Sequence, residues 1–172
     1  MAALLKLPAA FALAAMLAFA SLTAGCETQD PPPPGFERVR INGESFDLEL
    51  AIDHPSREEG LKGRENIPAD QGMLFVFPDV DKRSFWMHNC LAPIDIIYLD
   101  PTGRVTATHQ MKVELKQDGE AEAAYQRRLT RYGSKFAAKY VIELKGGRLE
   151  DLDVQEGQEI KLDHERLKAL AK

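Results

Sequence analysis

The sequence contains too few cysteines to build a disulfide framework. Only Cys26 and Cys90 occur among its 172 residues. Cys26 lies in an N-terminal segment with the pattern of an export signal, so Cys90 is expected to have no partner within the chain. An internal disulfide is therefore excluded, and the fold must be stabilised by the burial of apolar side chains.

An excess of positive charge is also missing. The chain has 22 Lys and Arg residues against 27 Asp and Glu residues, which leaves a formal net charge of −5. Nucleic acids and anionic lipid surfaces attract basic proteins, so neither is expected as a partner. A basic cluster at residues 127–135 follows Glu120 and Glu122, and we interpret it as a solvated face.

Long apolar runs are absent after the first 25 residues. The N-terminus has one, PAAFALAAMLAFASL, which follows Lys6 and leads into the small residues of LTAGC. This order is typical of a signal peptide, and the Cys after Ala-Gly resembles a bacterial lipobox. We predict a lipoprotein signal peptide over residues 1–25 and lipidation of Cys26, which anchors the chain to a membrane. The alternative is an ordinary signal peptide that is cut nearby and leaves Cys26 free.

A proline-rich stretch follows the predicted lipidation site. Four consecutive prolines in ETQDPPPPG favour an extended polyproline II rod. Residues 26–35 are therefore predicted to form the lipidated start and a short tether. Residues 36–162 are expected to form a single globular domain, and residues 163–172 a helical tail. The predicted location is the bacterial cell envelope, lipid-anchored and facing the periplasm.

The patterns within the predicted domain favour a β-rich α+β fold. Asn42-Gly43 between two alternating runs is a strong hairpin signal, and Ser56 followed by Glu59 matches the capping box of a short helix. Pro78 is expected to end a buried strand. Further strands are expected at residues 84–89, 94–100, 104–113, 137–144 and 158–163, and further helices near residues 120–132 and 149–154. Short strands separated by turns predict a small β-barrel or sandwich of about eight short strands with two or three short helices.

The runs EGLKGR, GMLFVFP, RSFWMHNCLAPIDIIYLD and AKYVIELKGG together resemble a widespread family of small prokaryotic domains, domain of unknown function 192. The family pattern is close to G-L-M-x-R, G-M-L-F-x-F, F-W-M-K-N-T-x-x-P-L-D and R-Y-V-L-E-L. The matching positions are Gly60, Leu61, Arg64, Gly72, Met73, Leu74, Phe75, Phe77, Phe85, Trp86, Met87, Asn89, Pro93, Asp95, Tyr140, Val141, Glu143 and Leu144. The resemblance covers about residues 36–162 and implies one compact domain, often with a secretion signal or lipid anchor.

The chain departs from the family pattern at several places. Lys62 stands where Met is usual, His88 replaces a typical Lys, and Cys90 replaces a typical Thr. Residues 114–134 form a longer segment than is usual in the family. The family has no established activity, so the resemblance supports the fold and leaves the function open.

Three polar residues of the family pattern are candidates for a site. Arg64 follows the first predicted helix, and Asn89 and Asp95 bracket the turn around Pro93. An Arg–Asp pair can hold a helix to a sheet, and the same groups can bind a small anionic or amide-bearing ligand. Both interpretations remain open from the sequence.

Trp86 and Met87 extend this candidate site. Neighbouring side chains on a strand point to opposite faces, so the two are not expected both to point inward. The outward one forms an apolar patch of the kind that binds ligands or partners. The predicted ligand- or partner-binding residues are Arg64, Trp86, Met87, Asn89 and Asp95.

Sulfur and imidazole ligands cluster in the same run. Met87, His88 and Cys90 suit a soft metal, but strand alternation separates Met87 from the other two, and two ligands are too few for a closed site. Cys90 with His88 or His109 is also a candidate thiolate pair, although a lone thiol is more often a small buried side chain. No metal or cofactor is therefore expected.

These observations favour a membrane-tethered envelope lipoprotein that binds a ligand or partner without catalysis. An enzyme acting on a small polar substrate through Arg64, Asn89 and Asp95 is the alternative. Soft-metal binding at His88 and Cys90 is the third hypothesis.

Overall fold

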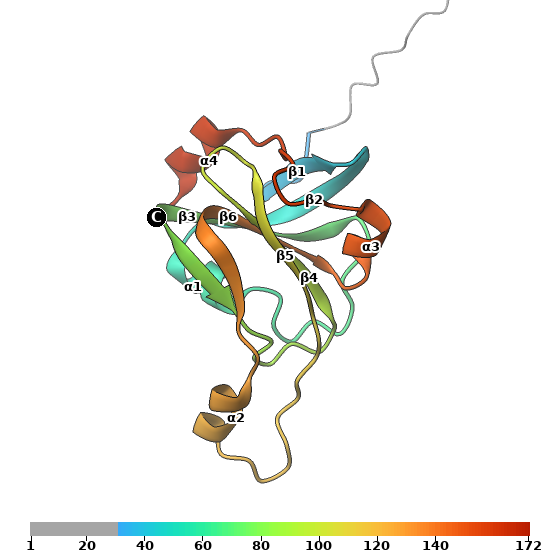
Figure 1. The fold of residues 1–172 in the computed structure, drawn as a ribbon, viewed down its shortest axis with the longest axis vertical. Coiled ribbons are helices and arrows are strands. Elements are labelled where there is room, and N and C mark those ends of the chain that lie inside the picture. Colours follow the sequence, from blue (N-terminus) through green and yellow to red (C-terminus); the bar gives the residue numbers. More distant parts are fainter. Residues whose placement is uncertain (1–30) are drawn as a thin grey trace, which may run out of the picture. The chain divides into compact units, whose positions relative to one another are not determined.

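A six-stranded mixed sheet is the main feature of the computed structural model, which describes residues 31–172 (Figure 1). Its strands lie in the order β1-β2-β3-β6-β4-β5, and four short helices accompany it within these residues. The predicted signal peptide and Cys26 lie outside the described residues. The β-rich α+β class is confirmed, with six strands where about eight were predicted. No helix between residues 31 and 172 has the length and apolar character needed to span a bilayer.

A hairpin forms one edge of the sheet. Strands β1 (Phe36–Ile41) and β2 (Glu44–Ala51) pair antiparallel. Asn42 and Gly43 join them with φ angles of 47° and 92°, and a two-residue type I′ turn requires positive φ at both positions. The hairpin predicted from this dipeptide is confirmed.

A helical crossover links β2 to β3 (Gln71–Phe85), because these two strands run parallel. The crossover contains α1 (His54–Glu59), and such a unit was not predicted. Asp53 caps α1 by accepting a hydrogen bond from the Ser56 backbone N–H at 2.9 Å, while the Ser56 hydroxyl accepts one from the Asp53 N–H at 3.2 Å. The N-cap is therefore Asp53, and the predicted cap Ser56 occupies the N3 position, where its hydroxyl completes the capping box.

The longest strands form an irregular ribbon. β3 pairs antiparallel with β6 (Tyr132–Lys145), and the register shifts between Val76 and Asp81. Pro78 lies in this shifted stretch, where its missing N–H removes no ladder hydrogen bond. The prediction that Pro78 ends the strand was wrong, because the bulge lets β3 continue to Phe85.

The other end of the sheet is formed by β4 (Ile94–Leu99) and β5 (Val105–Met111). β4 lies between β6 and β5, so β1 and β5 are edges and the sheet does not close into a barrel. The strand predicted at residues 158–163 contributes only one bridge within the described chain, Arg104 to Glu159.

Apolar side chains cover both faces of the sheet. Because strand residues alternate, Ile142 of β6 belongs to one core cluster and Val141 to the other. The Ile142 cluster is covered by α3 (Arg148–Leu152) and α4 (His164–Leu170). The Val141 cluster is covered by irregular segments that contribute Leu61, Ile67 and Met87, and a pocket opens on this side.

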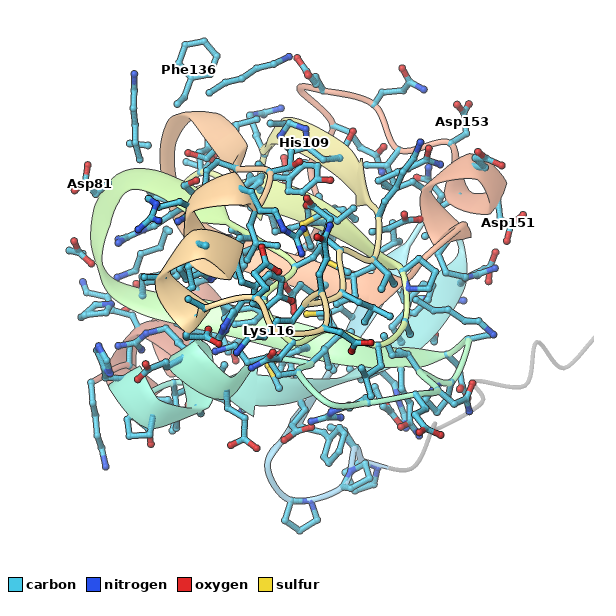
Figure 2. All side chains as sticks on the ribbon, turned by 90° about the horizontal axis from the view of Figure 1, so that it is seen from below. Asp81, His109, Lys116, Phe136, Asp151 and Asp153 are labelled. Carbon is cyan, nitrogen blue, oxygen red and sulfur yellow. The ribbon has the colours of Figure 1, made fainter. Side chains whose placement is uncertain are left out.

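Two residues of the ribbon differ from the regular alternation of its strands. Gly72 lies where a Cβ atom would come within 2.1 Å of the Glu143 carbonyl oxygen, so the two strands approach closely only because it is glycine. Phe136 lies in the second irregular stretch of β6, between the residues that pair with Lys82 and Ser84. It is 66% exposed and points away from the backbone (Figure 2).

Candidate ligand-binding pocket

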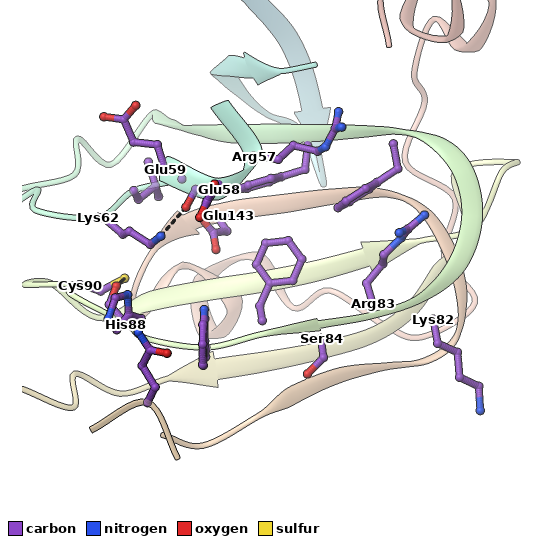
Figure 3. Close-up of a pocket in the computed structure, with 17 residues that line it drawn as sticks. Arg57, Glu58, Glu59, Lys62, Lys82, Arg83, Ser84, His88, Cys90 and Glu143 are labelled. Atoms are coloured by element: carbon purple, nitrogen blue, oxygen red, sulfur yellow. Dashed lines mark hydrogen bonds between the residues drawn. The ribbon is translucent and has the colours of Figure 1, made fainter. Parts of the chain in front are cut away.

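A pocket of about 560 Å³ lies between the C-terminal part of α1 and the ribbon (Figure 3). Its floor comes from β3 and β6, and one wall comes from α1 and the residues that follow it. The remaining wall is the segment that leaves β3 at Phe85. Pockets of this size accommodate small organic molecules.

Glu143 forms the polar floor of the pocket. It lies in β6, between β3 and β4, and only 5% of the residue is exposed. Its Oε2 atom has no hydrogen-bond partner among the described residues. Burial raises the pKa of Glu143 to about 8, although Arg64 and Lys62 act in the opposite direction. The carboxyl is therefore largely protonated at neutral pH, so it can both donate and accept a hydrogen bond.

Aromatic rings surround this carboxyl. Phe75 and Phe85 pack edge to face, with ring centroids 5.0 Å apart, and both line the pocket with Trp86 and Phe77. The Arg83 guanidinium lies over the Phe77 ring at 4.0 Å. The pocket thus combines one buried acid with apolar ring surfaces.

Charged side chains of both signs line the mouth. Arg83 pairs with Asp79 at 2.7 Å, and the ammonium of Lys62 donates to the Glu58 carbonyl. Figure 3 shows Lys62 beside Glu143 and Lys82 at the opposite end of the cavity. Lys62 therefore lies close to the carboxyl at the floor, whereas Lys82 belongs to the mouth alone (Figure 3).

The segment after β3 forms a tight turn that holds Met87 and Cys90 inside. The Cys90 N–H donates to the Met87 carbonyl at 3.3 Å, and Asn89 has a φ of 56°. Both Met87 and Cys90 are buried in the Val141 cluster. The prediction that strand alternation separates them was wrong, because β3 ends at Phe85 and the following residues are not extended.

Burial also decides the chemistry of Cys90. It raises the pKa of the Cys90 thiol to about 12, with a further contribution from Glu143. A thiol with this pKa is protonated at neutral pH and is a poor nucleophile. His109, the second imidazole considered as its base, contacts the Gly133 carbonyl at 2.8 Å.

Helix α2 (Glu122–Arg128) belongs to the long segment that departs from the family pattern, and it holds the turn from outside. The Tyr125 hydroxyl accepts a hydrogen bond from the Asn89 backbone N–H at 3.1 Å. The His88 imidazole lies 2.6 Å from a Glu122 carboxylate oxygen. Arg131, after the helix, places its guanidinium 3.4 Å from the centre of the Trp86 ring.

The structure does not place Arg64, Asn89 and Asp95 in this pocket. Arg64 forms a salt bridge with Glu49 at 2.7 Å. Asp95 is buried, and its carboxylate accepts a hydrogen bond from the Leu149 N–H of α3 at 2.7 Å. Burial raises the pKa of Asp95, while hydrogen bonds from the α3 backbone lower it. Neither side chain contacts the other through a hydrogen bond or ion pair in the described chain.

Two other predicted residues take different positions relative to the pocket. Trp86 lines it, whereas Met87 is fully buried behind it. Among residues 31–172, no three His, Cys, Asp or Glu side chains gather closely enough to hold a metal ion.

The family model of DUF192, described as an uncharacterised family, matches residues 37–162. The chain belongs to the DUF192 family. This match confirms the resemblance found in the sequence motifs. A comparison with curated proteins gave no significant match.

Two crystal structures resemble this DUF192 protein. One is a Sinorhizobium meliloti 1021 protein, provisionally described as a transcription regulator, with 30% identity and a TM-score of 0.59 over 73% of this chain and 92% of that chain. The other is a Novosphingobium aromaticivorans DSM 12444 protein of unknown function, with 23% identity and a TM-score of 0.62 over 74% of this chain and 85% of that chain. The second likeness supports the fold alone.

The sequence hypotheses for this DUF192 protein did not include Glu143 as a site residue. Its signal was available, because the run KYVIEL places one acid among apolar residues of a strand. A central strand that is apolar on both sides of such an acid buries it. The contribution of α1 to the pocket had no comparable local signal, since it depends on the parallel crossover.

Proposed function

We propose that this DUF192 protein is a small-ligand-binding accessory domain, tethered to a bacterial envelope membrane through a lipid on Cys26. The observation that carries the proposal is the Glu143 carboxyl, buried and with one oxygen unpartnered among the described residues, at the floor of a ring-lined pocket. A buried polar atom without a hydrogen bond is costly for the fold. A ligand or a bound water can supply the missing partner, and a buried acid that faces a pocket is a candidate for ligand binding.

A binding role fits the pocket better than the enzymatic alternative built on Arg64, Asn89 and Asp95. Arg64 is engaged by Glu49, and Asp95 by the backbone of α3. Cys90 is held as a protonated thiol by burial, which raises its pKa. The proposal therefore rests on the pocket over Glu143, with Trp86 as the predicted residue that lines it.

The description of the Sinorhizobium protein as a transcription regulator is not carried over to this chain. Proteins that bind DNA neutralise phosphates with basic side chains. The present chain has a net charge of −5, and its N-terminal pattern favours export from the compartment that holds the chromosome. Both properties support an envelope role.

The proposal is tested by capture of small molecules. The purified full chain is incubated with the small-molecule fraction of a bacterial envelope extract, washed and denatured, and the released compounds are identified by mass spectrometry. We expect compounds that the wild type retains and that Glu143→Leu loses, because leucine removes both hydrogen-bonding oxygens. Glu65→Gln is the matched control, since Glu65 is exposed and outside the pocket. Equal retention by wild type and Glu143→Leu contradicts the proposed site.

A further inference from the structure

The chemistry of the pocket narrows the class of ligand. We propose that it binds a neutral ring that carries hydroxyl groups, as a sugar does, with one hydroxyl held by the Glu143 carboxyl. This inference rests on the proposed function and adds the ligand class to it. Three properties of the pocket support it: the polar floor, the charges at the mouth and the state of the aromatic rings.

The polar floor suits a hydroxyl group. Glu143 Oε2 has no hydrogen-bond partner in the described chain, and the side chain is almost fully buried. A hydroxyl donates to a carboxylate and accepts from a carboxylic acid, so it satisfies this atom in either protonation state. An apolar ligand leaves the atom unpaired, which costs binding energy.

The mouth disfavours a cationic ligand, because its basic side chains outnumber its acidic ones. An anion is attracted at the mouth but is repelled at the floor by the ionised form of Glu143. A neutral ring with donors and acceptors can bond to groups of either sign. The charged lining residues besides Glu143 are Arg57, Lys62, Lys82 and Arg83, against Glu58 and Glu59.

Two aromatic rings that would otherwise attract a cationic ligand already hold cations of the chain. The Arg83 guanidinium lies 4.0 Å from the centre of the Phe77 ring, and the Arg131 guanidinium lies 3.4 Å from the centre of the Trp86 ring. A ligand cation would compete with these contacts. Phe75 and Phe85 contact each other without a guanidinium, and they offer ring surface to the C–H groups of a sugar.

The pH dependence separates a neutral ligand from a cationic one. Burial raises the pKa of Glu143 to about 8. The charged groups that lower its pKa are Lys62 and Arg64 after α1, and the Glu143 charge in turn raises the pKa of Cys90 after β3 and of Tyr98 on β4. A cation requires the ionised carboxylate, so its affinity rises about tenfold per pH unit up to this pKa. A hydroxyl bonds to both forms, so its affinity changes far less between pH 6 and 8.

The test uses sugar rings of similar shape that are neutral, cationic or anionic. Glucose, galactose and N-acetylglucosamine are the neutral probes, glucosamine in its N-trimethyl form, which is positively charged at every pH, is the cation, and glucuronate is the anion. Binding to the full chain is followed by the fluorescence of Trp86, the single Trp of the chain, which lines the pocket. We expect at least one neutral sugar to bind at least tenfold more tightly than glucosamine and glucuronate. Its affinity should change less than threefold between pH 6 and 8.

Variants connect this binding to the carboxyl. Glu143→Leu should lower the affinity for the neutral sugar at least tenfold, whereas Glu143→Gln, which keeps a donor and an acceptor, should lower it less than fivefold. Glu65→Gln, at an exposed position, should bind as the wild type does. Circular dichroism and the unfolding temperature show whether each variant is folded. If Glu143→Leu is not, Phe85→Leu, which removes a ring that lines the pocket, should lower the affinity instead, and unchanged binding by a folded Phe85→Leu contradicts the proposed site.

Each remaining outcome contradicts the ligand class. If glucosamine binds most tightly and its affinity rises with pH, the pocket is a cation site, and the proposed binding function stands. If glucuronate binds most tightly, the pocket prefers anions, and the proposed binding function again stands. If no sugar binds while the envelope extract yields a ligand that depends on Glu143, the class is wrong and the function stands. If neither experiment gives a ligand, both proposals fail.

Discussion

At the scale of single residues, two buried acids have different roles in this structure. The carboxylate of Asp95 accepts hydrogen bonds from backbone N–H groups at the start of α3. It acts in place of a capping side chain, because the N-cap residue of α3 is Gly147. Glu143 has one oxygen without a partner in the described chain. The first acid is explained by the fold, whereas the unpaired oxygen of the second is the observation on which the proposed ligand site rests.

The buried state of Glu143 predicts a pH-dependent stability. Its pKa in the folded chain is raised from the ordinary 4.5 to about 8, so the folded state keeps a proton that the unfolded state releases. This contribution to stability is fully present below pH 4.5 and is lost as the pH rises to 8, at about 1.4 kcal/mol per pH unit. Glu143→Gln should lack this contribution, so its free energy of unfolding should fall less between pH 5 and 8.

Urea unfolding of wild type and Glu143→Gln at pH 5 to 9 measures this difference. Glu65→Gln, which changes an exposed acid, should follow the wild-type curve. Parallel curves for wild type and Glu143→Gln would show that the carboxyl is not protonated in the folded state.

The contact between Asp95 and α3 predicts that a substitution at this position lowers the stability of the fold. Asp95→Asn replaces a carboxylate oxygen that accepts from the Leu149 N–H with a weaker amide acceptor. We expect a decrease of about 1–2 kcal/mol in the free energy of unfolding at pH 7. Urea denaturation measures the change, and Asp118→Asn at an exposed loop position serves as the control. A loss no greater than that of the control would argue against the role of Asp95 at α3.

At the scale of elements, α2 acts on the pocket through the turn of residues 86–90. Tyr125 of α2 contacts Asn89, and Glu122 of α2 contacts His88. Arg131, which follows the helix, contacts Trp86. Hydrogen bonds from His88 and Lys116 lower the pKa of Glu122 to about 2. The helix therefore holds one wall of the pocket in place.

Removing one of these contacts should be visible in the fluorescence of Trp86. Arg131→Ala takes away the guanidinium over its ring. We expect a shift of the emission to longer wavelength, because water gains access to the indole, and a stability loss of about 0.5–1 kcal/mol. Arg127→Ala, at an exposed position of α2, should change neither property. Identical spectra for the two variants would mean that Arg131 does not cover Trp86.

Local signals predicted some elements well and others poorly. The hairpin at Asn42-Gly43 was predictable because the turn is encoded by two adjacent residues. The path of β3 through Pro78 was not, because a bulge against β6 permits it. Likewise, the inward position of both Met87 and Cys90 depends on a turn whose Asn89 N–H is held by the distant Tyr125. Long-range contacts, rather than alternation along a strand, therefore determine that both side chains point inward.

At the scale of the whole molecule, the lipid anchor is the property most open to test. Cys26 follows an apolar run and small residues, and Cys90 is buried. Cys26→Ser should therefore abolish incorporation of radiolabelled palmitate in a bacterial host and move the chain from the membrane fraction to the soluble fraction, because acyl chains supply the membrane affinity. Cys90→Ser is the control and should remain in the membrane fraction. Retention of label by Cys26→Ser would refute the lipoprotein prediction.

The ribbon of β3 and β6 also has a consequence for how the chain folds. It pairs Gly72 with Leu144 and Phe85 with Tyr132, so the paired residues lie 72 and 47 positions apart in the sequence. Domains dominated by such distant pairings fold in milliseconds to seconds, because a long loop must close first. The final contacts form only after β6 is available, near the C-terminal end of the chain. If the chain is exported as proposed, its sheet would therefore remain open until β6 has crossed the membrane.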